Sequence, residues 1–174
     1  MRLVRLEKIE TLKPFDCGDE DLNDFLLSDA RLYNEQFLAN TFVLENDNET
    51  IAYYSLLNDK ISQTTLSKNL WRKLRKSIPH EKHLGSYPAV KIGRLAVSKN
   101  YRGMDIGTNL VGAIMRIFIY HHENSACRCL TVDAYKDAVS FYEKNGFKKM
   151  VNDTELPENA MTVPLYLDLK QVKL

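Results

Sequence analysis

The chain has 174 residues, of which 44% are hydrophobic and 27% are charged. That composition is typical of one globular domain with a continuous core, so we expect a single domain over residues 1–174. Its 24 basic and 23 acidic residues leave a net charge of +1, which excludes a global attraction to nucleic acid or to anionic lipid. No segment approaches the roughly 20 apolar residues of a membrane-spanning helix, and the N-terminal stretch lacks an apolar core of signal-peptide length. We therefore expect a cytoplasmic protein.

The three cysteines are Cys17, Cys127 and Cys129, an odd number. A Cys-x-Cys pair on one face of a strand has poor geometry for a disulfide. Together with His121 and His122 the later two cysteines form a local cluster, but its spacing matches neither a zinc ribbon nor a zinc finger. We expect reduced thiols and no metal site.

The first half of the chain predicts, in order, a strand, helices and a hairpin. Residues 2–10 alternate well enough for a strand, after which proline and glycine break the pattern. Asp19 is a candidate helix cap, and apolar residues then recur at helical spacing up to about Leu38. Two β-rich runs, at 41–44 and 50–57, flank a polar tetrapeptide suited to a hairpin turn. We expect these two runs to form an antiparallel pair.

The second half predicts a strand–helix–strand unit followed by a helix and closing strands. Residues 58–88 show no strand character and contain a short, basic amphipathic helix around 66–76. The expected strands lie at 89–97, 129–132, 147–150 and 162–167, and the expected helices lie after Gly107 and at 138–144. The two strands around the first of these helices should be parallel and joined by a right-handed crossover. Strands and helices of this kind build a mixed α/β sheet.

The stretch from Val90 to Gly107 reads as a strand, a turn that contains Gly103, and the first turn of a long helix. Such a turn presents unpaired backbone N–H groups and the positive end of a helix dipole to one point, which suits phosphate binding without a metal. The turn follows the carboxyl end of a strand, where α/β sheets bind ligands. The pattern predicts a phosphorylated cofactor.

Two motifs in the chain resemble those of the GCN5-related N-acetyltransferases. Arg102-Gly103-Met104-Asp105-Ile106-Gly107 is similar to their R/Q-x-x-G-x-G/A motif. Ala138-Val139-Ser140-Phe141-Tyr142-Glu143-Lys144-Asn145-Gly146-Phe147 is similar to their A-x-x-F-Y-x-x-x-G-F element, about 35 residues later. The resemblance covers roughly residues 41–167. It implies that family's fold, a mostly antiparallel sheet with one splayed parallel strand pair flanked by helices, and acetyl-coenzyme A as co-substrate.

The resemblance also implies which residues hold that co-substrate. The backbone of Leu95, Ala96 and Val97 would pair with the pantetheine arm, because a bulge in this family splays the strand from its neighbour. The remaining implied contacts are Arg102, Gly103, Met104, Asp105, Ile106, Gly107, Thr108 and Phe141. Asp105 departs from the motif, since it stands where the first motif glycine is expected. A carboxylate pointing inward would repel the pyrophosphate, so we expect Asp105 to point to solvent while its amide serves the ligand.

For the chemistry, the resemblance implies that Tyr142 is the general acid for the departing thiolate. A phenol with a pKa near 10 holds its proton at neutral pH. The alternative is a tyrosine that only packs beside Phe141 and Phe147. A backbone N–H near Leu95 or Val97 is the expected oxyanion donor. Many relatives carry a glutamate on the strand that here spans 91–95, where this chain has no carboxylate, so either water relays the proton or the amine arrives neutral.

Further segments resemble the toxin subgroup of the family, which acetylates the α-amine of aminoacyl-tRNA. They are Phe15-Asp16-Cys17-Gly18, Asp21-Leu22-Asn23-Asp24-Phe25-Leu26, Tyr53-Tyr54-Ser55-Leu56 and Gly93-Arg94-Leu95-Ala96-Val97. The resemblance implies aminoacyl-tRNA as substrate, Arg94 as a substrate-binding residue, an antitoxin partner and a homodimer. Basic residues at Lys60, Lys68–Lys76 and Lys82 could contact phosphates, although such a charge run is also typical of a solvated helix face.

Three other functions remain open at this point. The first is acetylation of a small-molecule or protein amine. The second is a non-catalytic sensor of coenzyme A, which Asp105 and the missing base favour and Tyr142 opposes. The third is a dinucleotide-binding enzyme, although the chain lacks the G-x-G-x-x-G turn.

Overall fold

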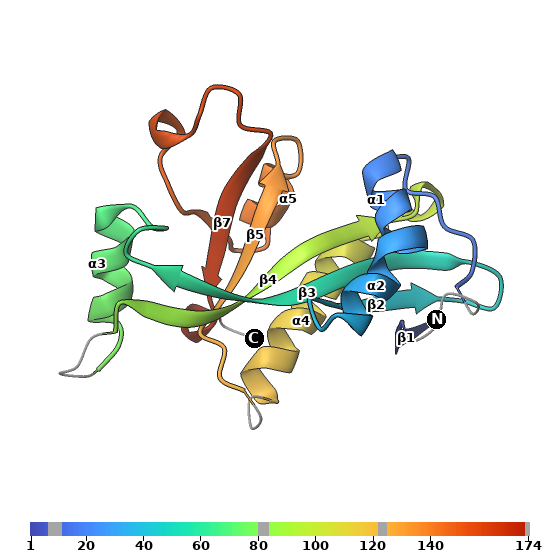
Figure 1. Ribbon diagram of the computed structural model, residues 1–174, viewed down its shortest axis with the longest axis horizontal. Coiled ribbons are helices and arrows are strands. Elements are labelled where there is room, and N and C mark those ends of the chain that lie inside the picture. Colours follow the sequence, from blue (N-terminus) through green and yellow to red (C-terminus); the bar gives the residue numbers. More distant parts are fainter. Residues whose placement is uncertain (7–11, 80–83, 122–124, 173–174) are drawn as a thin grey trace. The chain divides into compact units, whose positions relative to one another are not determined.

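The computed structural model describes residues 1–6, 12–79, 84–121 and 125–172 (Figure 1). Its strands are β1 (Arg2–Arg5), β2 (Asn40–Glu45), β3 (Thr50–Ser62), β4 (Ser86–Val97), β5 (Cys129–Tyr135), β6 (Lys148–Lys149) and β7 (Thr162–Asp168). Its helices are α1 (Glu20–Asp24), a π-helical turn (Phe25–Asp29), α2 (Ala30–Glu35), α3 (Lys68–Lys76), α4 (Ile106–Tyr120) and α5 (Val139–Lys144). None of the described helices is long and apolar enough to cross a membrane.

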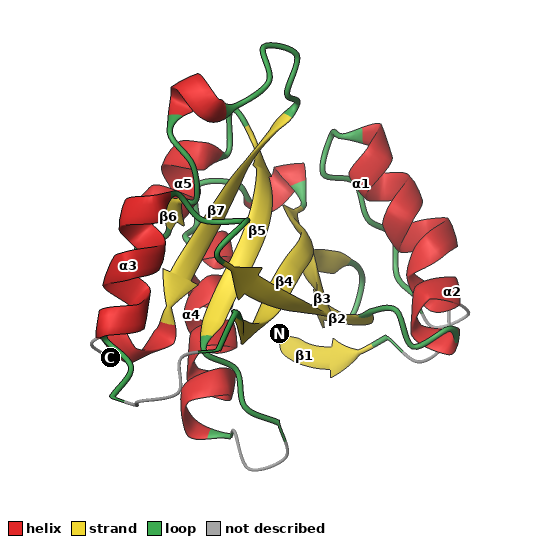
Figure 2. Cartoon of the chain, turned by 60° about the vertical axis from the view of Figure 1, so that its left-hand side comes forward, coloured by secondary structure: helices red, strands yellow, loops and turns green. Residues whose placement is uncertain are grey.

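Hydrogen bonds join the strands in the order β1-β2-β3-β4-β5-β7-β6. β4 and β5 form the predicted parallel pair, in which Ala89 lies opposite Cys129 and Lys91 opposite Thr131. The ladders β1–β2, β2–β3, β5–β7 and β6–β7 are antiparallel. Helices accompany this sheet (Figure 2). The predicted mixed α/β class is therefore confirmed.

The chain divides into two compact units, the first of which comprises Met1–Asn58 and Ile92–Ile114. In this unit Asp19 caps α1 as predicted, because its Oδ1 accepts a hydrogen bond from the Leu22 amide at 3.1 Å. The Tyr53 hydroxyl donates to the Leu22 carbonyl at 2.7 Å and so fastens the helix to β3. The buried core of this unit contains Leu6, Cys17, Phe25, Leu26, Ala30, Val43, Tyr53 and Ala96.

The second unit comprises Asp59–Lys91 and Met115–Leu174. α3 packs through Trp71 and Leu74, and the Trp71 ring lies 5.3 Å from the ring of Tyr87. The expectation that 58–88 lacks strand structure is wrong at both ends, since β3 continues to Ser62 and β4 begins at Ser86. Burial alternates along the end of β3 and places Ile61 in the core, so the strand extends although its side chains are mostly polar.

Candidate functional site

The parallel ladder between β4 and β5 ends at the pair Lys91 and Thr131, although both strands continue beyond it. In the first unit the rest of β4 runs through Leu95, Ala96 and Val97. Ala96 is buried in the core, while Leu95 and Val97 are half-buried. The predicted pantetheine-binding residues thus belong to a stretch of β4 beyond the β5 ladder.

Two residues with left-handed backbone form the turn between β4 and α4 in the first unit. Gly103 has φ +77° and Asp105 has φ +54°. A Cβ at Gly103 would meet no atom within 4 Å, so the backbone conformation rather than space calls for glycine there. α4 begins directly afterwards at Ile106, and Asn109 donates to the Asp105 carbonyl at 2.9 Å as the first helical bond. The amides that follow Asp105 are the orphan donors of the helix start.

Asp105 is exposed, as are Met104 and Thr108. A non-glycine residue at positive φ is strained, although aspartate tolerates this region better than most residues. Because the left-handed turn is kept at Asp105, its own amide and those of Ile106 and Gly107 stay at the start of the helix. Substitution of the motif glycine therefore retains the turn but adds a negative charge to it.

The side chain of Arg102, a predicted cofactor contact, has a partner within the protein that the sequence did not predict. Its Nη2 donates to the Cys17 carbonyl, 85 residues earlier in the chain. That segment is itself held by Asp16, which accepts hydrogen bonds from the Gly18 amide at 2.8 Å and from Lys99. The hydrogen bond from Lys99, followed by those from Gly18 and Asn23, lowers the pKa of Asp16 to about 2. Arg102 thus connects the turn to residues 16–18, the first of the toxin-like segments.

Arg94, the predicted substrate-binding residue, lies in the same unit against the helices. Its guanidinium carbon is 5.1 Å from the centroid of the Phe25 ring, and Nη2 lies 3.7 Å from Asp21 Oδ2. Nη1 donates to the Gly93 carbonyl at 3.0 Å. The side chain remains 38% exposed, so it is held in place by Phe25 and Asp21 yet accessible to a ligand.

Tyr142 and Phe141 belong to the second unit, on α5, which packs against β5. The Tyr142 ring stands edge-on to Phe141 and Phe147, with centroid distances of 5.0 and 5.4 Å. Burial raises the pKa of the Tyr142 phenol above its usual value, so it stays protonated at neutral pH. Gly146, at φ +89°, ends the helix, and Phe147 then donates to the Tyr142 carbonyl at 3.1 Å. Both interpretations of Tyr142, acid and packed aromatic, are compatible with this geometry.

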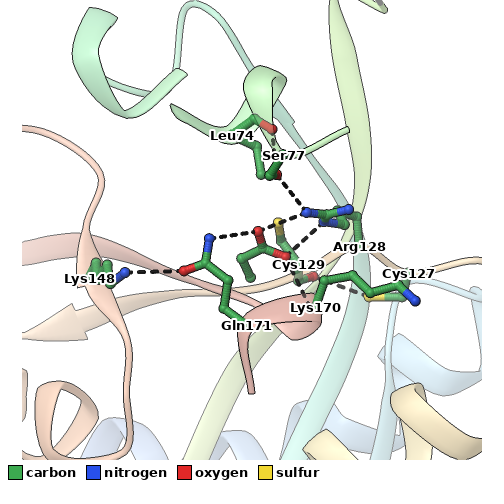
Figure 3. Close-up of polar contacts among 9 residues, drawn as sticks. Leu74, Ser77, Cys127, Arg128, Cys129, Lys148, Lys170 and Gln171 are labelled. Carbon is green, nitrogen blue, oxygen red and sulfur yellow. Dashed lines mark hydrogen bonds and ion pairs between the residues drawn. The ribbon is translucent and has the colours of Figure 1, made fainter. Parts of the chain in front are cut away.

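A polar network in the second unit joins α3 to β5 and β7 (Figure 3). Arg128 donates to both carboxylate oxygens of Asp168, at 2.7 and 2.9 Å, and also to the Ser77 hydroxyl at 2.9 Å. Gln171 donates to Asp168 at 3.2 Å. A buried carboxylate with this many donors is a structural tie. The cavity beside it, about 490 Å³, is lined by none of the predicted site residues.

The cysteines of the second unit are free and weakly acidic. The Cys127 thiol donates to the Cys129 carbonyl at 3.1 Å (Figure 3), and burial raises the pKa of Cys127 to about 11. Such thiols are poor nucleophiles and poor metal ligands at neutral pH. Within residues 1–6, 12–79, 84–121 and 125–172 no three His, Cys, Asp or Glu side chains gather as a metal site. His122 and Lys82 lie outside the described residues.

The strain at Asp105 predicts an unusual response to glycine. Asp105→Gly should leave the free energy of unfolding unchanged or raise it by up to about 1 kcal/mol, since relief of the left-handed strain offsets the added chain entropy. Asp137→Gly, at an exposed turn residue without positive φ, is the control and should lose about 0.5–1 kcal/mol. Urea denaturation measures both. Equal losses in the two variants would contradict the strain argument.

Comparisons with known proteins place the chain in a family. The model of the acetyltransferase (GNAT) domain matches residues 38–149. A Tyr-to-Phe mutant of KacT is 25% identical, with a TM-score of 0.72 over 98% of this chain and 96% of that chain. AtaT complexed with acetyl-methionyl-tRNAfMet is 24% identical, with a TM-score of 0.72 over 97% of this chain and 95% of that chain. AtaTR bound with AcCoA is also 24% identical, with a TM-score of 0.74 over 97% and 94% of the two chains.

The match over more than half of the chain agrees with the two sequence motifs and with the mixed sheet that contains one parallel pair. The chain belongs to the GCN5-related N-acetyltransferases, and it is an N-acetyltransferase that uses acetyl-coenzyme A.

Proposed function

We propose that the protein acetylates the α-amine of aminoacyl-tRNA and acts as the toxin of a toxin–antitoxin pair. The observation that carries the proposal is the basic face of α3. Trp71 and Leu74 anchor this helix in the core, Lys68, Arg72, Lys73 and Lys76 are exposed, and Arg75 is half-buried. The basic residues of α3 are Lys68, Arg72, Lys73, Arg75 and Lys76, and none of them pairs with a carboxylate in the part of the chain that the structure describes. Unneutralised cations on an anchored helix suit a phosphate backbone.

The turn and strand of the first unit fit acetyl-coenzyme A. The left-handed residues Gly103 and Asp105 leave the amides of the α4 start as donors for the pyrophosphate. The backbone of Leu95–Val97 offers strand-like partners for the pantetheine amides. When bound, the co-substrate supplies an activated acetyl thioester. Arg102 would support this site through its bond to Cys17, by fixing the turn.

Tyr142 is the proposed general acid. Its phenol carries a proton at neutral pH, and burial raises its pKa further, so a proton is available for the thiolate that leaves as the acetyl group is transferred. The amine must reach the carbonyl carbon in its neutral form. Because an α-amine next to an ester is less basic than a lysine side chain, it is largely neutral near pH 7 and needs no strong base. The absence of a carboxylate from 91–95 therefore agrees with an aminoacyl ester as acceptor.

Acetylation of a small amine is the second candidate, and the net charge of +1 favours it because a tRNA-binding protein is usually more basic.

If the protein is a tRNA-directed toxin, two further proposals go with that function. One is an antitoxin partner, as in the structure of the AtaT mutant toxin bound to the C-terminus of the antitoxin AtaR. The other is a homodimer of single-domain chains acting in the cytoplasm.

The role of Tyr142 predicts a loss of turnover without a loss of cofactor binding. Tyr142→Phe should lower kcat about a hundredfold or more, because the acid is removed while the ring still packs between Phe141 and Phe147. The Kd of acetyl-coenzyme A, measured by calorimetry, should change less than about twofold. Tyr120→Phe, at an exposed tyrosine of α4, is the control and should change neither. An unchanged kcat in Tyr142→Phe would show that Tyr142 only packs beside Phe141 and Phe147 and is not the general acid.

The substrate is tested with labelled acetyl-coenzyme A and a mixture of aminoacyl-tRNA and free amines. We expect the label on aminoacyl-tRNA, with a rate that falls steeply as salt is added. Replacing Lys68, Arg72 and Lys73 together by Gln should remove up to about three phosphate contacts. The slope of the logarithm of the rate against the logarithm of the salt concentration should become shallower accordingly. The matched control replaces Lys136, Lys144 and Lys170 by Gln. These three lysines are exposed and lie outside α3, so the salt dependence should stay as in the wild-type protein. Label on free amines only, at a rate insensitive to salt, would favour the second candidate.

A further inference from the structure

The cavity of about 490 Å³ in the second unit lies on residues that acetyl transfer does not use. Its walls come from the end of α5, from β6, from the end of β7 with the residues that follow, and from Met115 of α4. β6 begins at Lys148, opposite Tyr166, so in the described sheet no strand covers the outer edge of β7 from Leu167 onward. A cavity of this volume is large enough for a small organic molecule.

Two lysines on the cavity wall are available to an anion. Lys144 at the end of α5 and Lys148 of β6 are both exposed, and neither forms an ion pair within the described residues. The Lys148 Nζ has one long hydrogen bond, 3.4 Å to Gln171 Oε1 (Figure 3), although an ammonium group has three donors. The wall therefore carries two positive charges that no described carboxylate neutralises.

Asp168 is the one acidic residue among the described residues that line the cavity, and its charge is already neutralised. Arg128 donates to both of its oxygens, and the Lys170 amide and the Gln171 side chain donate to it as well. The last carbonyls of α5 are also occupied, because they accept hydrogen bonds from amides of the turn that follows. The lysines thus set the electrostatic character of the cavity.

The inner part of the cavity wall is apolar. Met115 of α4 and Leu167 of β7 are buried, and Val172 is half-buried. Because these side chains are less exposed than the two lysines, they lie deeper, and the ammonium groups lie at the mouth. Such a wall favours an apolar group, whose burial releases water from both surfaces.

We propose that this cavity binds a small organic anion with an apolar body. The body lies against Met115, Leu167 and Val172, and the anionic group accepts hydrogen bonds from the ammonium groups of Lys144 and Lys148. A neutral molecule would leave the two charges without a partner, and an inorganic ion would leave the apolar wall in water. The site is distinct from the acetyl-transfer residues and does not rest on the proposed function.

The test uses anilinonaphthalene sulfonate, a fluorescent organic anion, with the full-length chain saturated with coenzyme A so that the co-substrate site is filled. We expect saturable binding of one probe molecule per chain, and the Kd should rise with added salt. Octanoate should displace the probe. Octanol, which has the same chain but no charge, should require at least about a tenfold higher concentration.

Two double variants assign the probe to the cavity. Lys144→Gln with Lys148→Gln should raise the Kd of the probe about tenfold, because both ammonium groups are lost while the apolar wall remains. Lys60→Gln with Lys136→Gln is the matched control, since it removes the same charge from exposed lysines of the second unit that do not line the cavity. Its Kd should stay within about twofold of the wild-type value. Both variants replace exposed side chains, so equal Tm values confirm that they fold.

Equal Kd values in the two double variants would overturn the inference, because the probe would then bind elsewhere. Displacement by octanol at the concentration at which octanoate acts would also overturn it. So would the absence of saturable probe binding to the protein filled with coenzyme A.

Discussion

The parallel ladder between β4 and β5 is short, and along β4 the candidate site begins after the ladder ends. Up to Lys91 and Thr131 the two strands pair and contribute Ala89 and Cys129 to a buried core. Beyond that pair β4 is released from this ladder and leads through Leu95–Val97 into the turn before α4. A longer ladder would have paired this strand edge with β5; we propose that a pantetheine arm pairs with it instead.

The start of α4 adds a second condition, which is electrostatic. Gly103 and Asp105 hold left-handed backbone on either side of Met104, and the helix amides that follow have no helical partners. Asp105 shows that the backbone conformation matters more here than glycine itself. The negative charge it brings is exposed, where solvent screens it. The Arg102 side chain donates a hydrogen bond to the Cys17 carbonyl and so ties the turn to residues 16–18.

Local patterns in the sequence predicted a large part of the fold and of the candidate site. The cap at Asp19, the parallel pair around α4 and the glycine turn at Gly103 all depend on residues close in sequence, and such signals can be read directly. The end of β3 was missed because its polar residues hide the alternation that buries Ile61. Contacts between distant residues were also missed. The bond of Arg102 to Cys17 and the meeting of Asp59 with Lys91 and Asp133 depend on strand order and register, which no local spacing encodes.

We propose that the end of β4 and the start of α4 together bind acetyl-coenzyme A. Amide hydrogen exchange with and without coenzyme A tests this proposal, at a concentration where calorimetry shows the site to be filled. We expect slower exchange at the amides of Leu95–Val97 and of Gly103–Thr108, with little change in β1 or α3. Tight binding that leaves both segments unprotected would overturn the proposal.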